Sequence, residues 1–304
     1  MSAPAAAPVL SARAVVRARR RAARRRFVAD FRAQRAGVAG VAILVVFIGL
    51  ALLAPVLFGS DQLQVTKATG GTLQPPDGSF PLGTDETGRS VLALVVWGAR
   101  VSLLVGVAAT VISMAIGTLV GIASGHFGSW LGALLERLTD WFLVIPFLPL
   151  AIVLATVLGS SLLNVIIVIG VTSWPGTARL VRAQTLSVEA RPYLERARVL
   201  GGGHWHQMSR HVLPNVMPLV LANTTLTVAI AILSETTLSF LGLGDPFRVS
   251  WGSMLDNAFA AGAISAGAWW YLLPPGVCVV IVVLAFTLVG RALENVLDPR
   301  SREG

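Results

Sequence analysis

Apolar residues occupy most of this chain in long runs, which shorter polar segments separate. A membrane core of about 30 Å takes roughly 20 apolar residues as helix, because each backbone amide must be satisfied inside its own segment. The pattern therefore predicts an all-α membrane protein with six transmembrane helices. These spans are expected at residues 38–58, 101–123, 141–158, 162–181, 216–243 and 272–289.

Composition agrees with a membrane protein. Hydrophobic residues make up 55% of the chain and charged residues 13%, and the mean hydropathy is +0.74, unlike an ordinary soluble domain. The single cysteine, Cys278, excludes an intramolecular disulfide and a cysteine-based metal cluster. We expect it to be a packing residue in the sixth span.

Basic residues are unevenly divided between the two sides of the predicted spans. Of the 24 Lys and Arg residues, 20 fall on the side of the termini and only four on the other. Basic residues beside spans stay in the cytoplasm, so both termini and residues 175–217 are predicted to be cytoplasmic. Membrane topology thus explains the net charge of +9. Nucleic-acid binding is not indicated, because the basic residues are not accompanied by a cluster of aromatic residues.

The chain then divides into five parts. The external loop after the first span has about 40 residues, and loops of that length in compact proteins are usually functional. The parts are a basic cytoplasmic segment (1–36), the first span (37–58), the extracytoplasmic loop (59–97), a transmembrane domain (98–297) and a cytoplasmic tail (298–304).

Aromatic, small and acidic residues add detail to the spans. An external stretch near residues 244–271 holds four aromatic residues that fit an interfacial belt or a partner contact equally well: Trp251, Trp269, Trp270 and Tyr271. Three glycines recur every four residues in the second span and predict close helix packing: Gly117, Gly121 and Gly125. A carboxylate in an apolar span, Glu235, suits a water-filled path or a position near the interface. The candidates for a translocation path are Glu235, Asn223 and Asn164.

A charged segment interrupts the apolar pattern between residues 175 and 217. Pro192 suits the first turn of a helix, and the preceding Arg191 is pushed towards an extended conformation. Gly201 can adopt a left-handed conformation and end that helix. The result is a helix of about nine residues and 13 Å, with an apolar face made by Tyr193, Leu194, Ala197 and Leu200. Because so short a helix is marginal alone, it must pack on lipid or on a partner.

The same segment carries a motif. Glu195, Ala197 and Gly201, followed by Leu213 and Pro214, resemble the coupling motif of ABC importer permeases, which is Glu-Ala-Ala, three residues, Gly, and later Leu-Pro. Further stretches resemble the C-type membrane subunit of the dipeptide and oligopeptide permease family. They lie at residues 81–85, 88–89, 98–102, 174–176, 178–179, 239–244, 250–252 and 297–300.

This resemblance implies a type I ABC importer permease fold in a bacterial plasma (inner) membrane. It also implies a non-catalytic subunit that imports peptides or a related small solute. It implies four partners besides membrane lipid: a second homologous permease subunit, two cytoplasmic subunits that bind ATP and Mg, and an extracytoplasmic solute-binding protein. The expected ATPase-coupling residues are Tyr193, Leu194, Glu195, Arg196, Ala197, Leu200 and Gly201. Several positions depart from the family pattern: Arg196 for Ala, Thr87 for Leu, Ser90 for Asp, and residues 245–248 for a longer proline-rich turn. Nickel and glutathione importers share these motifs, so the substrate stays open.

Signals of catalysis are weak. The only lysine, Lys67, follows Thr66 and belongs to no P-loop, so no ATP hydrolysis and no cofactor are expected on this chain. Three histidines lack a carboxylate or cysteine at ligand spacing, so no metal site is predicted: His204, His206 and His211. Glu136 and Asp140 are expected to meet Arg137 or a cytoplasmic partner. The alternative function is an ion- or proton-coupled secondary transporter that uses Glu235.

Overall fold

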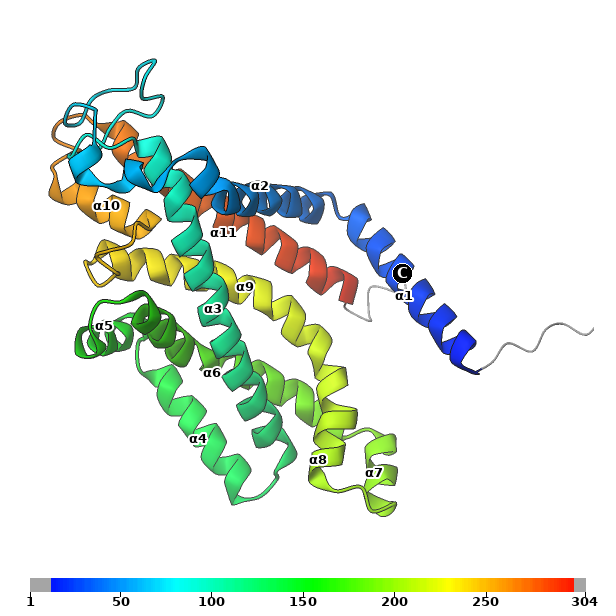
Figure 1. Ribbon diagram of the computed structural model, residues 1–304. Coiled ribbons are helices and arrows are strands. Elements are labelled where there is room, and N and C mark those ends of the chain that lie inside the picture. Colours follow the sequence, from blue (N-terminus) through cyan, green and yellow to red (C-terminus); the bar gives the residue numbers. More distant parts are fainter. Residues whose placement is uncertain (1–11, 298–304) are drawn as a thin grey trace, which may run out of the picture.

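The computed structural model describes residues 12–297, and within that range it contains helices and no β-strand. The predicted all-α fold is confirmed, whereas the 298–304 tail and residues 1–11 of the basic segment lie outside the described residues. Figure 1 shows the axes of α2, α11 and α9 roughly aligned, with α11 running opposite to the other two and α3 crossing them. The helices are α1 (Ala12–Ala33), α2 (Arg35–Leu57), η1 (Ser60–Leu63), η2 (Val65–Lys67), α3 (Val91–His126), α4 (Trp130–Val144), α5 (Phe147–Leu158), α6 (Leu162–Glu189), α7 (Pro192–Val199), α8 (His204–Gln207), η3 (Met208–Val212), α9 (Leu213–Phe240), α10 (Trp251–Ala260) and α11 (Trp269–Leu297).

Five helical segments in the described range are long and apolar enough to cross a membrane. Four of them are α2, α3, α6 and α11, and the fifth runs continuously through α8, η3 and α9. A bent pair, α4 and α5, brings the number of spans to six if the pair counts as one. The chain is therefore a multi-pass membrane protein.

The third predicted span, residues 141–158, is wrong as a straight helix. α4 ends at Val144, α5 begins at Phe147, and the two helices are bent by 90°. Pro146 causes the break, because it has no backbone N–H and disfavours a helical conformation at Ile145, which is extended with ψ 123°.

α3 begins ten residues before the predicted second span. Ser90 caps its N-terminus, where the Ser90 Oγ accepts from the Ala93 backbone N–H at 3.5 Å. The 36-residue helix is about 54 Å long and exceeds the membrane core. Residues 91–97, predicted as part of the external loop, are thus the first turns of α3, and Trp97 Nε1 ties them to α2 by donating to Phe58 O at 3.0 Å.

The rest of the 58–90 loop is built around Asp85, which is fully buried. Asp85 Oδ1 accepts from the backbone N–H groups of Thr87 and Arg89 at 2.9 and 2.8 Å, and Oδ2 accepts from Arg89 Nε at 2.7 Å. Thr87, one of the departures from the family pattern, also donates through Oγ1 to Asp85 at 2.8 Å. At the loop surface, the backbone N–H groups of Phe80 and Ser79 donate to Asp77 and lower its carboxyl pKa.

Three of the four aromatic residues near 244–271 belong to the core, which corrects both interpretations offered for them. Trp251 and Tyr271 are fully buried, and Trp270 is nearly so. Trp251 Nε1 donates to Val95 O at 3.0 Å. Trp270 packs against Gly83, where a Cβ atom would lie only 2.5 Å from Trp270 Cδ1. Only Trp269 is exposed and available to lipid or a partner. Tertiary contacts between loops and helices, invisible in the local pattern, decide this outcome.

The glycine stripe of α3 packs against α6, as predicted. A Cβ atom at Gly117 would lie 2.7 Å from Thr177 Cβ, and one at Gly121 would lie 2.7 Å from Ala178 O. Gly125 continues the contact against Thr185. Small residues let two backbones approach closely, and van der Waals contact then supplies the packing energy that lipid cannot.

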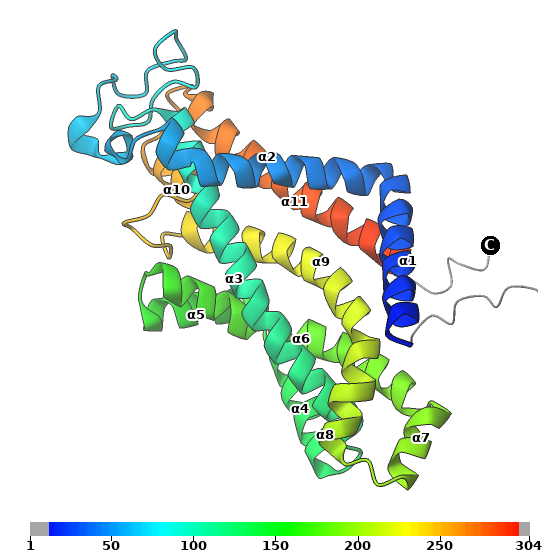
Figure 2. The ribbon, with the colours of Figure 1, turned by 45° about the vertical axis from the view of Figure 1, so that its right-hand side comes forward.

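Buried residues form three clusters. The first joins α2, α3, α9, α10 and α11, the second joins α3, α5, α6 and α9, and the third joins α3, α6, α7, η3 and α9. We call the end that holds residues 58–90 and α10 the loop end, and the end that holds α7 and α8 the junction end. Figure 2 shows that α1 turns away from the line of α2, with the turn at Gln34. α7 and α8 lie beside the final turns of α3 and α6 in both views.

Candidate functional site

α7 owes its limits to one proline and one glycine. Arg191 is extended (φ −84°, ψ 138°), and Pro192 occupies the first turn, where its missing N–H costs nothing. Gly201 has φ +82°. Its N–H donates to Arg198 O at 2.9 Å, and the Gly202 N–H donates to Ala197 O at 2.8 Å. These two bonds form a Schellman cap, which ends the helix and satisfies its last carbonyls.

Leu194 attaches α7 to the body of the protein. Its side chain is fully buried, although most of α7 is exposed. Burying a leucine side chain contributes roughly 1.5–3 kcal/mol, enough to hold a helix too short to be stable alone. The buried cluster around it joins α3, α6 and the start of α9, and comprises Met114, Ile122, Val181, Val188, Val212, Val216 and Val220.

The opposite side of this segment presents apolar side chains to the outside. Val199, Leu200 and Trp205 are 83%, 86% and 77% exposed, and we call these three the docking patch. The single apolar face predicted for the helix is therefore wrong, because Leu194 packs into the protein whereas Leu200, which follows the last residue of α7, is exposed. A patch of this kind indicates an interaction surface.

The remaining predicted coupling residues on α7 precede the patch in the sequence. Glu195 and Arg196 are exposed, and Ala197 is half-buried. The ring of Tyr193 lies 6.1 Å from that of His211, between centroids. The segment thus offers one acidic side chain, Glu195, and several exposed arginines next to apolar surface, a combination that suits contact with another protein.

Acidic residues on α4 pair with α6. Arg182 Nη2 donates to Glu136 Oε2 at 2.8 Å, and Arg179 Nη2 donates to Asp140 Oδ1 at 2.8 Å. The two carboxylates therefore pair with arginines of α6 and not with Arg137, because α4 lies alongside α6. Their contact with a cytoplasmic partner stays a prediction. The pairs are partly exposed, so they orient the two helices more than they stabilise them.

Glu235 is fully buried and bonded within the chain. Ser102 Oγ of α3 donates to Glu235 Oε2 at 2.9 Å, and Ser239 Oγ donates to Oε1 at 2.8 Å. The Trp251 backbone N–H in turn donates to Ser102 Oγ at 3.3 Å. The carboxyl group therefore joins α9, α3 and α10, which is the geometry of a packing contact.

The two asparagines named with Glu235 have other partners. Asn164 Nδ2 donates to Leu158 O at 2.6 Å and to Gly159 O at 3.0 Å, in the turn between α5 and α6. Asn223 Nδ2 donates to Thr177 Oγ1 at 3.2 Å and links α9 to α6. The three candidates bond to separate sets of residues, so the described structure does not bring them into one site, and a translocation role for them stays a prediction.

Replacement of Glu235 separates a packing role from a titrating role. Glu235→Leu leaves the Ser102 and Ser239 hydroxyls without their acceptor, at about 1–3 kcal/mol for each, so the yield of folded chain should fall. Glu235→Gln keeps an acceptor and should preserve both folding and uptake. The measurements are monodisperse yield after solubilisation and substrate uptake. Normal folding with lost uptake in Glu235→Gln would instead support a titrating carboxylate on the path.

The structure also contains a cavity at the loop end, which the sequence did not predict. It has a volume of 1210 Å³, and α2, α3, α9, α10 and the surrounding loops form its walls. Trp97 lines it beside Arg100, whose guanidinium lies 5.0 Å from the indole centroid. Charged residues on separate segments complete it, so no local sequence signal could reveal it: Arg89, Asp245, Arg248 and Asp256.

Two histidines of the junction end are hydrogen-bonded to each other, and the other two are in ring contact. In residues 12–297, no group of three or more His, Cys, Asp or Glu side chains is arranged to hold a metal ion. His204 Nδ1 lies 2.9 Å from His126 Nε2, and the rings of His206 and His211 are 5.4 Å apart.

Comparisons with known proteins place this architecture in a family. Residues 117–303 match the family "Binding-protein-dependent transport system inner membrane component", and residues 23–76 match "N-terminal TM domain of oligopeptide transport permease C". A putative peptide permease of Brucella suis is 36% identical over 268 residues, which cover 83% of this chain and 86% of the relative.

Two relatives are dipeptide transport system permeases. That of Bacillus subtilis is 34% identical over 267 residues, with 87% of this chain and 82% of the relative covered. That of Alkalihalophilus pseudofirmus is 33% identical over 266 residues, with 87% and 86% covered. The first family match includes the glycine stripe, α7 and the docking patch. The chain therefore belongs to the family of binding-protein-dependent transport system inner membrane components, the permease subunits of ABC importers.

Proposed function

We propose that this chain imports peptides as one of two membrane subunits of an ATP-driven transporter, and that α7 and the docking patch bind the cytoplasmic ATPase subunits. The observation that carries the proposal is an exposed apolar patch at the capped end of α7 and the start of α8, inside the region that matches the permease family. The names of the relatives support peptides as substrate. The comparisons give no support to a secondary transporter.

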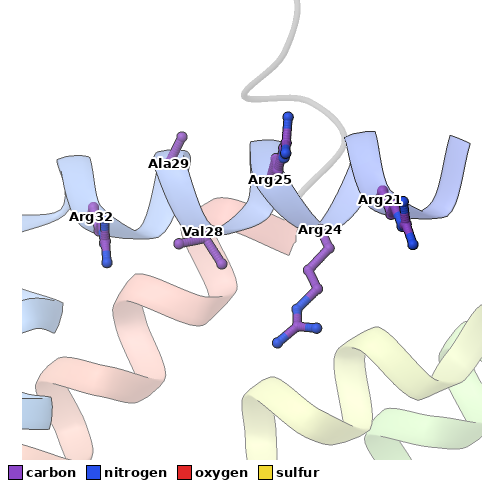
Figure 3. A pocket seen from close by; sticks show the side chains of 6 residues that line it. All are labelled: Arg21, Arg24, Arg25, Val28, Ala29 and Arg32. Atoms are coloured by element: carbon purple, nitrogen blue, oxygen red, sulfur yellow. The ribbon is translucent and has the colours of Figure 1, made fainter. Parts of the chain in front are cut away.

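The charges of α1 support a cytoplasmic junction end and cytoplasmic termini. Arg21, Arg24, Arg25 and Arg32 line a hollow of 640 Å³ along α1 (Figure 3). α7 adds further arginines on the same side. Basic side chains beside membrane spans favour the cytoplasm, where anionic lipid headgroups attract them.

The loop end then faces the opposite compartment, and its features suit the binding protein. Asp85 and Arg89 hold the 58–90 loop in one conformation, so a partner meets a preformed surface. Phe247 is fully exposed at the rim of the cavity. Aromatic anchors of this kind are enriched where proteins bind each other.

Reconstitution tests this function. We expect ATP-dependent peptide uptake into proteoliposomes only when this chain, its membrane partner, the ATPases and the binding protein are all present. The purified chain alone should hydrolyse no ATP above background, because it has no P-loop to hold the phosphates. Robust turnover by the isolated chain, or uptake that survives removal of the ATPases, would contradict the proposal.

A further inference from the structure

Four polar side chains from four helices meet beside α7. His126 at the end of α3 is buried, and its Nδ1 lies 2.5 Å from Glu189 Oε1 at the end of α6. His126 Nε2 lies 2.9 Å from His204 Nδ1 of α8. Arg198 of α7 donates through Nη2 to the second oxygen, Glu189 Oε2. We call His126, Glu189, Arg198 and His204 the junction cluster.

The hydrogen-bonding capacity of these groups is well matched. A carboxylate only accepts, so both His126 Nδ1–H and Arg198 donate to Glu189. In the contact between the two imidazoles, either His126 Nε2 or His204 Nδ1 must carry a proton and donate it to the other nitrogen. Arg198 Nε also donates to Gln207 Oε1 at 3.1 Å, and Gln207 Nε2 donates to Gly202 O at 2.6 Å. The same network therefore fixes the turn that follows α7.

The junction cluster and Leu194 attach α7 in different ways. An apolar contact is non-directional, so Leu194 alone would let the helix rotate about its attachment. Charge-assisted hydrogen bonds need a defined geometry, so Arg198 fixes the orientation of α7 relative to α3 and α6. Those two helices are themselves joined through the glycine stripe. A movement of Arg198 therefore reaches the transmembrane helices directly.

We propose that the junction cluster positions α7 and transmits its displacement to α3 and α6, with Glu189 as the central positioning residue. This inference rests on the proposed function, because it assumes that partner ATPases move α7. Glu189 accepts from one residue on α3 and one on α7, and its side chain is largely buried. Loss of its charge should separate ATP hydrolysis from transport.

The first test is Glu189→Gln in the complete transporter. We expect ATPase binding and ATP hydrolysis to persist, while peptide uptake per ATP hydrolysed falls about tenfold, the loss expected for one hydrogen bond to a charged group. The matched control is Glu136→Gln, which breaks an exposed pair between α4 and α6 and should leave the ratio unchanged.

The second test is amide hydrogen exchange of the full chain in nanodiscs. Glu189→Gln should raise exchange in α7 about tenfold while α9 stays protected, because only the local attachment is weakened. Arg198→Gln should have the same local effect. Its side chain is 52% exposed, so its replacement cannot collapse the core.

Wild-type exchange of α7 in both variants, or wild-type uptake per ATP in Glu189→Gln, would overturn the role of the cluster. Failure of the proposed function has a different signature, because the unsubstituted transporter would then show no ATP-driven uptake. The exchange measurement still tests the positioning role in that case, since it needs neither ATPases nor peptide.

Discussion

Gly121→Leu is expected to abolish accumulation of the folded chain. A Cβ atom at Gly121 would lie 2.7 Å from both Ala178 O and Val181 Cβ, and backbone cannot move aside as a flexible side chain can. Separating α3 from α6 would also break the buried clusters that both helices share. The cost is at least about 3 kcal/mol, the upper end of ordinary overpacking.

The measurement is the amount of monodisperse protein recovered from solubilised membranes. Gly49→Leu is the matched control, because Gly49 also lies in a transmembrane helix but has no atom within 4 Å of the place that a Cβ atom would take. We expect near wild-type yield for that control. Equal yields from the two variants would show that α3 and α6 pack more loosely than these distances require.

Gly201→Val is expected to abolish transport while leaving the chain in the membrane. Gly201 has φ +82°, a conformation that a β-branched residue adopts only at a cost of about 2 kcal/mol. The Schellman cap would open, and Leu200 of the docking patch would change direction. Copurification of the ATPase subunits should fall more than about tenfold, and uptake with it.

Gly203→Val provides the control for backbone strain. Gly203 is two residues away, has φ −67° and has open space around it, so valine should be tolerated there. Glu195→Lys complements the pair, since it reverses an exposed charge without altering the backbone and should also abolish uptake. Normal uptake in both Gly201→Val and Glu195→Lys would remove the coupling role from α7.

Much of this fold follows from local patterns. Apolar runs identified the spans because a membrane forces backbone hydrogen bonds to close within each helix. Pro192 and Gly201 marked α7 because their backbone preferences act within one or two residues. The glycine stripe was readable for a similar reason, since four-residue spacing places small residues on one helix face.

Other features depend on which helices become neighbours. Pro146 was visible in the sequence, but hydropathy continued across it and concealed the 90° bend. Glu235 read as a costly charge until Ser102, far away in the sequence, proved to be its partner. Trp251 looked like an interfacial residue for the same reason, because its burial depends on contacts with residues far away in the sequence, such as Val95.

The sequence by itself determined that this is an all-α membrane protein with a short capped helix between two spans, because hydropathy, proline and glycine act over a few residues. Tertiary structure alone decided how that helix is held. His126, Glu189, Arg198 and His204 come from four helices and have no shared local pattern. Packing α3 against α6 brings their ends together, and only then do the isolated charges and histidines become one hydrogen-bonded cluster.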